Sequence, residues 1–148
     1  MRVVIGSDHA GFVLKETIKA LLGRMGVPCE DVGAWSAASS DYPDYAAAAA
    51  RLILDGRADR GILVCGTGIG MVIAANKIPG IRAALACSAA TARLARSHNN
   101  AQVLTLGGRT TPAADVEPIV RAFLTTEYEA GRHDGRLAKV ARLERKDS

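Results

Sequence analysis

The segment from Cys65 to Gly70 brings a thiol together with a glycine-rich turn. It reads Cys-Gly-Thr-Gly-Ile-Gly and follows a strongly apolar run. Glycines let the backbone approach a ligand closely, and a helix that begins here presents free N–H groups. A thiol beside such groups can be held as a thiolate, which makes it a usable base or nucleophile. The segment predicts an oxyanion or phosphate cradle beside a cysteine, although it also fits a small buried cysteine next to a packing turn.

Three better-known glycine motifs do not fit this segment. A Walker A loop ends in Gly-Lys-Ser/Thr, which is missing here. A dinucleotide fingerprint needs a later third glycine and a carboxylate about 20 residues on, where Ala86, Cys87 and Ser88 stand instead. A cysteine phosphatase loop would close with an arginine, but Met71 and Val72 occupy that place.

Other polar residues gather near the ends of apolar runs, and each has a structural alternative. Asp8 and His9 follow the first run, where Asp8 could simply cap the next helix. The pair His98-Asn99 precedes the last run, and a histidine at a helix end can simply favour the helix dipole. Arg132 and Arg136 share one face of a helix that begins early enough, and could clamp a phosphate or form a solvated basic face.

The elements that must position these residues alternate along the chain. Short β-branched or apolar runs predict strands, and segments with helical periodicity separate them. Five buried strands separated by helices predict a single doubly wound α/β domain over residues 1–148, with a parallel sheet covered on both faces. Ligands bind beyond the carboxyl ends of such strands. We expect the polar residues next to the strands to lie there: Asp8 and His9, Cys65 to Gly70, His98 and Asn99, and Gly107 to Arg109. The expected strands are 2–6, 28–32, 61–65, 82–87 and 102–106, and the expected helices are 10–25, 44–55, a segment ending near 76, 88–98, 113–125 and 134–144, with Gly56 as a C-cap.

Composition narrows the possible classes of protein. The 148 residues are 49% hydrophobic and 23% charged, as in a globular domain. The sequence has neither an apolar run long enough for a membrane helix nor a signal peptide, and its three cysteines form no CxxC pair, so we expect a cytoplasmic protein without a structural zinc site. Of the net charge of +4, +3 lies from residue 132 onward. Only 4% of the residues are aromatic, which disfavours binding of nucleic acid.

The order of these motifs resembles the ribose-5-phosphate isomerase B family, which also contains galactose-6-phosphate isomerase subunits. The resemblance spans essentially the whole chain, and its most specific part runs from Cys65 to Arg82. The motifs that carry it are Asp8-His9-Ala10-Gly11, Asp41-Tyr42-Pro43-Asp44-Tyr45, Cys65 to Met71 with Ala75-Asn76-Lys77, His98-Asn99, Gly107-Gly108-Arg109 and Gly131-Arg132-His133.

The resemblance implies a cofactor-free aldose–ketose isomerase that acts on a phosphorylated sugar and forms a homodimer or tetramer. It implies that Cys65 moves a proton between C1 and C2, that Thr67 serves the substrate oxygens and that His98 opens the sugar ring. It also implies that the helix at about 132–148 contacts a partner subunit, so that active sites are shared. The resemblance further assigns the loop amides of Gly66, Gly68 and Gly70 to the enediolate, Asp8, Tyr42 and Asn99 to hydroxyl groups, and His9, Arg109, Arg132 and Arg136 to the phosphate, with no metal.

Two positions bear on the choice of substrate. One branch of the family has a glutamate in the glycine loop and lacks the cysteine, whereas this chain has Met71 there and keeps Cys65. The loop 33–40 carries Trp35 where small or polar residues are common, and we expect Trp35 to pack within the loop. The same mechanism on allose 6-phosphate, galactose 6-phosphate or erythrose 4-phosphate is one alternative. A non-catalytic protein that binds sugar phosphate or nucleic acid is another.

Overall fold

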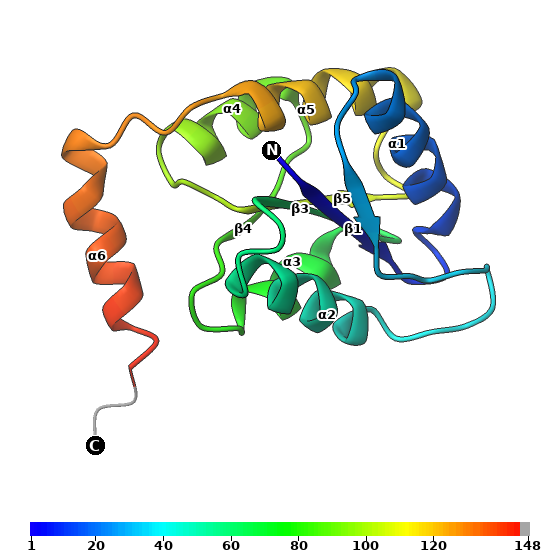
Figure 1. Cartoon of the computed structure of the whole chain (residues 1–148), viewed down its shortest axis with the longest axis horizontal. Helices are drawn as coiled ribbons and strands as arrows, with labels where there is room; N and C mark the ends of the chain where they lie inside the picture. The colour runs from blue at the N-terminus through cyan, green and yellow to red at the C-terminus, as the bar shows by residue number, and fades with distance from the viewer. Residues whose placement is uncertain (146–148) are drawn as a thin grey trace.

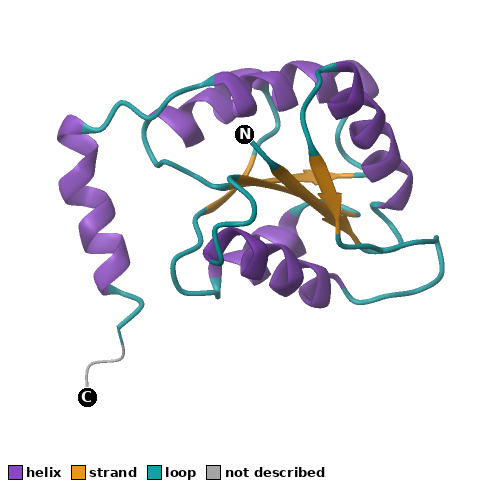
Figure 2. Ribbon diagram, viewed as in Figure 1, coloured by secondary structure: helices purple, strands orange, loops and turns teal. Residues whose placement is uncertain are grey.

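A five-stranded parallel sheet with helices on both faces forms the body of the protein (Figures 1 and 2). The structure is a computed structural model that describes residues 1–145. The strands lie side by side in the order β2-β1-β3-β5-β4. Within residues 1–145, no helix has the length and hydropathy of a membrane-spanning segment. The strands are β1 (Val3–Ser7), β2 (Cys29–Asp31), β3 (Arg60–Cys65), β4 (Ala83–Leu85) and β5 (Val103–Gly107), and the helices are α1 (Phe12–Arg24), α2 (Tyr42–Leu54), α3 (Ile69–Asn76), α4 (Ala89–Ser97), α5 (Ala113–Thr125), the 3₁₀ turn η1 (Gly131–His133) and α6 (Asp134–Arg142).

The predicted doubly wound α/β class is confirmed. Helices α1, α4 and α5 cover one face of the sheet, and α2 and α3 cover the other (Figure 1). The first layer is built on large side chains such as Ile18, Leu22 and Phe123. The second layer uses Ala46 and Ala49 of α2, whose small side chains let that helix lie close to the sheet. The middle strand β3 is buried from both sides, as its continuous apolar run predicts.

Most predicted elements are shifted by only one or two residues, and the shift at the start of α2 has a clear physical cause. Helix α2 begins at Tyr42 rather than 44 because Asp41 is extended and Pro43 fits the first helical turn, where its missing N–H is not needed. The helix expected over 134–144 ends at Arg142. The segment of about 132–148 that is expected to contact a partner subunit includes residues 146–148, which lie outside the described part of the chain. Gly56 follows α2 with φ +72°, which confirms the expected glycine at that helix end.

Lys15 is a buried lysine that joins α1 to the loop after β2. Its Nζ donates to both carboxylate oxygens of Asp31 at 2.9 Å and to the carbonyl of Ala34. Burial alone would raise the pKa of Asp31, but hydrogen bonds from Lys19 and Lys15 outweigh it and hold the pKa below its usual value. This anchor fixes the start of the loop 32–41, whose far end reaches the candidate site.

The expectation that Trp35 packs within this loop is wrong for most of its side chain. Trp35 is 71% exposed. The Lys15 ammonium lies 5.1 Å from the centroid of the indole ring, within the range of a cation–π contact. The indole therefore lies at the surface, beside the Lys15 ammonium.

Replacement of Lys15 tests the anchor. Lys15→Met should lower the free energy of unfolding by about 2–3 kcal/mol, because it leaves the Ala34 carbonyl without its donor and Asp31 with one cation. Lys19→Met is the matched control: Lys19 is one-third exposed and donates to the same carboxylate, so its loss should cost less than about 1 kcal/mol. Urea unfolding measures both, and equal losses would contradict the anchoring role of Lys15.

Candidate active site

A cleft of about 210 Å³ lies at the carboxyl ends of β1, β3 and β5. This is the edge at which ligands bind in doubly wound folds. The cleft brings together eight of the residues singled out in the sequence, from four separate segments of the chain. Its lining consists of Asp8, His9, Ala10, Tyr42, Cys65, Gly66, Thr67, Gly70 and Arg109.

Cys65 ends β3 and lies almost completely buried beneath the glycine loop. The N–H of Gly68 donates to the Cys65 Sγ at 3.1 Å, just before α3 begins. Gly68 has a φ of +78°, and a Cβ there would lie 2.6 Å from the side chain of Leu85, so the turn needs glycine for two reasons. The Cys65 sulfur thus lies at the N-terminus of α3 with a backbone N–H directed at it.

The end of β5 fixes the shape of this loop. Gly108 N–H donates to the Cys65 carbonyl at 2.8 Å, and Arg109 N–H donates to the Gly66 carbonyl at 2.9 Å. Thr105 is fully buried in β5, and its hydroxyl donates to the Gly68 carbonyl at 3.0 Å. The sequence interpretation missed Thr105, although a lone hydroxyl inside an apolar strand was a usable signal, because a buried hydroxyl needs a partner.

Asp8 and His9 leave β1 at the opposite wall of the cleft. Asp8 is buried, and its Oδ1 accepts the Gly11 N–H at 3.0 Å, so it both lines the cleft and caps the turn before α1. His9 is held through Nδ1, which lies 3.2 Å from the N–H and 3.1 Å from the carbonyl of Ser40. Ser40 can therefore accept from the ring when Nδ1 is protonated and donate to it when it is not.

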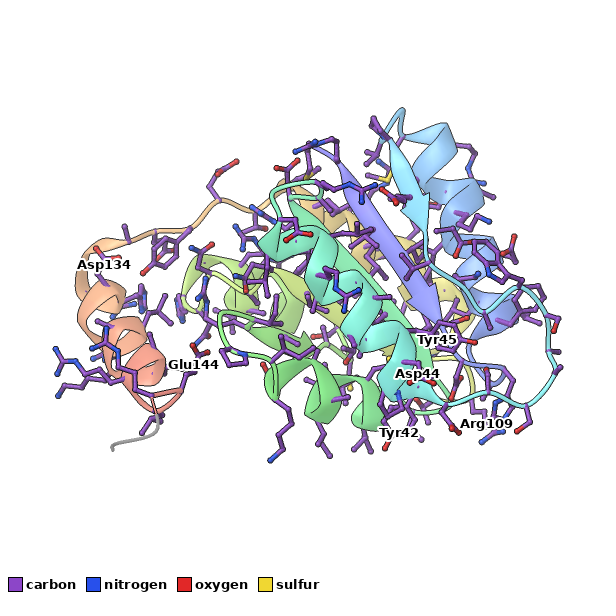
Figure 3. All side chains as sticks on the ribbon, turned by 60° about the horizontal axis from the view of Figure 1, so that its bottom comes forward. Tyr42, Asp44, Tyr45, Arg109, Asp134 and Glu144 are labelled. Carbon is purple, nitrogen blue, oxygen red and sulfur yellow. The ribbon has the colours of Figure 1, made fainter. Side chains whose placement is uncertain are left out.

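Tyr42 and Arg109 close the two sides of the glycine loop, and Figure 3 shows both at the same end of the molecule. The ring of Tyr42 lies against Gly70, where an added Cβ would come within 2.9 Å of three ring atoms. Arg109 Nη1 would lie 3.0 Å from a Cβ at Gly66. The glycines thus make room for the neighbouring tyrosine and arginine as well as for a ligand.

His98 and Asn99 do not join this cleft, and the expectation that they lie at the same edge is wrong for a single chain. His98 caps the C-terminus of α4, which runs back to the amino edge of the sheet before β5 begins. Arg82, directly before β4, donates through Nε to the Asn99 carbonyl at 3.1 Å. The physical reason is topological: the segment that precedes a parallel strand lies at the edge opposite to its carboxyl end.

Buried Arg96 fixes the turn that carries His98. It donates to the side chain of Asn100 at 3.0 Å and to the carbonyl of Ala101 at 2.6 Å, and burial lowers the pKa of its guanidinium to about 10. Asn100 itself has a φ of +46°, which this pair of bonds stabilises. Neither Arg82 nor Arg96 was singled out in the sequence, because arginines after or within a helix usually face solvent.

Arg132 and Arg136 also lie away from the Cys65 cleft. Arg132 lies in η1 and Arg136 in α6, so the helix begins too late to include both, and both side chains are exposed. The ring of His133, next to Arg132, stacks on that of His98 with centroids 4.4 Å apart. In Figure 3, Asp134 at the start of α6 and Glu144 just beyond its end both lie far from Tyr42 and Arg109. The sequence-predicted residues therefore form two groups: one in the cleft, and one around His98 and η1.

The chain is similar to known proteins of one family over nearly its whole length. The family model described as ribose/galactose isomerase matches residues 3–140. Ribose-5-phosphate isomerase B of Escherichia coli is 42% identical over 98% of this chain and 97% of its own length. The structure of ribose-5-phosphate isomerase B from Clostridium thermocellum superposes with a TM-score of 0.96 at 42% identity, covering 97% of each chain. That of Mycoplasma genitalium, with bound ribulose-5-phosphate, gives a TM-score of 0.91 at 40% identity over 99% of this chain and 97% of that chain. The chain therefore belongs to the ribose/galactose isomerase family.

Proposed function

We propose that this protein interconverts ribose 5-phosphate and ribulose 5-phosphate through an enediolate, without a cofactor, and that Cys65 is the base. The observation that carries the proposal is the buried Cys65 sulfur, which accepts the Gly68 N–H at the base of a glycine loop that opens α3. The names of the Escherichia coli and Mycoplasma genitalium relatives support the choice of substrate.

The chemistry needs one base that reaches two adjacent carbons. In the aldose, the Cys65 thiolate removes the proton from C2, the C1–C2 double bond forms, and the electron pair of the carbonyl becomes negative charge on O1. The thiol then returns its proton to C1, while the proton of the C2 hydroxyl passes to O1 and leaves a carbonyl at C2. Thr67 lines the cleft beside Cys65 and is assigned to this oxygen-to-oxygen transfer.

Fixed backbone donors stabilise the charge that develops on O1 and O2. The bonds from Thr105, Gly108 and Arg109 hold the loop from Gly66 to Gly70 in one conformation, so its amides are positioned before the reaction, with that of Gly68 directed at the Cys65 sulfur. Asp8 and Tyr42 line the same cleft and are assigned to the sugar hydroxyl groups. Their side chains then orient the sugar so that C1 and C2 face the sulfur.

The phosphate end of the substrate is assigned to two subunits. His9 and Arg109 line the cleft of their own chain, whereas Arg132 and Arg136 belong to the group around His98 at the other edge of the sheet. We therefore assign Arg132, Arg136, His98 and Asn99 to the cleft of a neighbouring subunit in a homodimer, or in a tetramer built from such dimers. Helix α6 supports this, because it buries none of its residues and leaves Val140 and Leu143 exposed.

The first test measures the turnover of the wild-type protein on a panel of sugar phosphates and the turnover of a Cys65→Ala variant on ribose 5-phosphate. The wild-type protein should isomerise ribose 5-phosphate faster than allose 6-phosphate, galactose 6-phosphate or erythrose 4-phosphate. Cys65→Ala should lower kcat at least about 10²- to 10⁴-fold because the base is lost. The thermal unfolding curve of Cys65→Ala should stay close to that of the wild type. Cys87 is exposed and lies outside the cleft, so the control variant Cys87→Ala should keep full activity. Near-normal kcat in Cys65→Ala would rule out the cysteine base, and preference for another sugar phosphate would correct the substrate.

The second test separates ring opening from isomerisation. Ribose 5-phosphate is cyclic and must open, whereas ribulose 5-phosphate cannot close a furanose ring because its 5-oxygen carries the phosphate. His98→Asn should therefore slow the reaction of ribose 5-phosphate more than that of ribulose 5-phosphate, measured as initial rates at saturation. Equal losses with the two substrates would show that His98 has another role.

The third test asks whether the site is shared. Cys65→Ala and the double variant Arg132→Ala/Arg136→Ala should each be nearly inactive. In a hybrid dimer, one cleft carries both defects and the other carries neither. About half of randomly paired dimers are hybrids, so co-expression should restore roughly a quarter of wild-type activity. Background activity in purified hybrids would show that the arginines act on the cleft of their own subunit.

A further inference from the structure

Three potential metal ligands converge at a place that the proposed reaction uses only in part. His98, Glu129 and His133 bring their donor atoms within 4.8 Å of one another. We propose that these three side chains form a binding site for a divalent transition-metal ion such as Zn²⁺. No spacing of ligands along the sequence indicates such a site, because His98 lies about 30 residues before the other two.

His133 supplies an independent observation that points to a ligand. Its side chain is 93% buried, and its Nε2 has no hydrogen-bond partner among the described residues. The nearest acidic group is the carboxylate of Glu129, whose Oε2 lies 3.6 Å from this nitrogen. A buried ring nitrogen without a partner is costly, and a metal ion would satisfy its lone pair.

The backbone holds the three ligands together. Glu129 N–H donates to the Ser97 carbonyl at 3.0 Å. This bond holds Glu129 beside the end of α4 and hence beside His98. Ala130 follows with a φ of +57°, a sparsely populated conformation for a residue with a side chain, and turns the chain into η1. His133 N–H then donates to the Ala130 carbonyl at 3.1 Å, which returns His133 to the ring of His98.

The ligand set suits zinc. Two neutral imidazoles and one carboxylate form a common zinc set that leaves a fourth position for water or another ligand. Metal–ligand distances of about 2.0–2.2 Å in a tetrahedron require donor atoms roughly 3.4 Å apart. The donors are already within 4.8 Å, so rotation of the side chains can bring them to this spacing. Glu129 is exposed at the rim, which gives the ion a path to His133.

The consequence for activity, which rests on the proposed function, is inhibition. A His98 nitrogen that coordinates Zn²⁺ cannot exchange a proton with a sugar ring. Zn²⁺ should therefore inhibit the reaction of ribose 5-phosphate more strongly than that of ribulose 5-phosphate. Inhibition should be reversed by a chelator.

Calorimetric titration of the metal-free protein with Zn²⁺ tests the site directly. One ion per chain should bind with micromolar affinity, and Co²⁺ in its place should show the intense visible bands of tetrahedral coordination. Glu129→Gln and His133→Gln should each weaken binding at least tenfold. Glu127→Gln, an exposed glutamate outside the cluster, is the matched control and should leave affinity unchanged.

The exposed cysteines need their own control. A Cys29→Ser/Cys87→Ser variant should keep the affinity, because neither cysteine belongs to the His98, Glu129 and His133 cluster. Absence of Zn²⁺ binding, equal affinity in Glu129→Gln, His133→Gln and wild type, or loss of binding only in the cysteine variant would each overturn the site.

Binding and catalysis fail separately. Zn²⁺ binding that depends on Glu129 and His133 in a protein without isomerase activity would uphold the site and reject the proposed function. Normal isomerase activity without Zn²⁺ binding would uphold the proposed function and reject the metal site. Glu129→Gln should keep its basal rate and lose sensitivity to Zn²⁺, whereas equal inhibition of this variant and wild type would reject the link between the site and His98.

Discussion

The arrangement of the cleft depends on the hydrogen bonds that join the ends of β3 and β5. The parallel register pairs Cys65 with Gly107, so the loops after the two strands leave the sheet side by side. The backbone bonds from Gly108 and Arg109 and the hydroxyl of Thr105 then hold the glycine loop in one conformation. Each such bond contributes only about 0.5–1.5 kcal/mol to stability. Their main effect is on the loop, because a segment rich in glycine has a large conformational entropy to lose.

The strand order places that pairing at the centre of the sheet and separates two groups of polar residues. Because β5 lies between β3 and β4, the ends of β3 and β5 are neighbours and share a cleft. The same α/β winding carries the end of α4 back to the amino edge, with His98 and Asn99. Within one chain these two groups of residues cannot meet. For the shared site that we propose, a two-fold pairing is the simplest geometry in which each group meets the other group of a second copy.

The amino edge is as firmly built as the cleft. Arg96 is buried beneath the turn after α4, with its guanidinium 6.0 Å from the centroid of the Phe123 ring, and Arg82 holds the same turn from the side of β4. A rigid turn suits the role that we propose for His98, which is to meet a substrate held by another subunit. The turn also keeps the His98 ring stacked on that of His133. An ion bound by Glu129 and His133 would therefore lie next to the His98 imidazole.

Local sequence was sufficient to predict the strands, the helices and the cysteine–glycine loop. Apolar runs bounded by glycine identified β3 and β5, and the end of α2 followed from Gly56. These features depend on neighbouring residues along the chain, whose propensities and spacing act locally. The residues that line the cleft from β1, β3 and β5 were predictable for the same reason, since each directly follows a strand.

Tertiary structure alone decided which of these residues meet. The position of His98 and Asn99 could have been predicted, because in a parallel sheet the segment that precedes a strand lies at the edge opposite the carboxyl ends. The sequence could not reveal that Lys15 and Arg96 are buried, since both occupy helices whose charged side chains usually reach solvent. Nor could it bring Glu129 and His133 to His98. Contacts between distant segments depend on how the layers pack, and no local pattern of residue types encodes that packing.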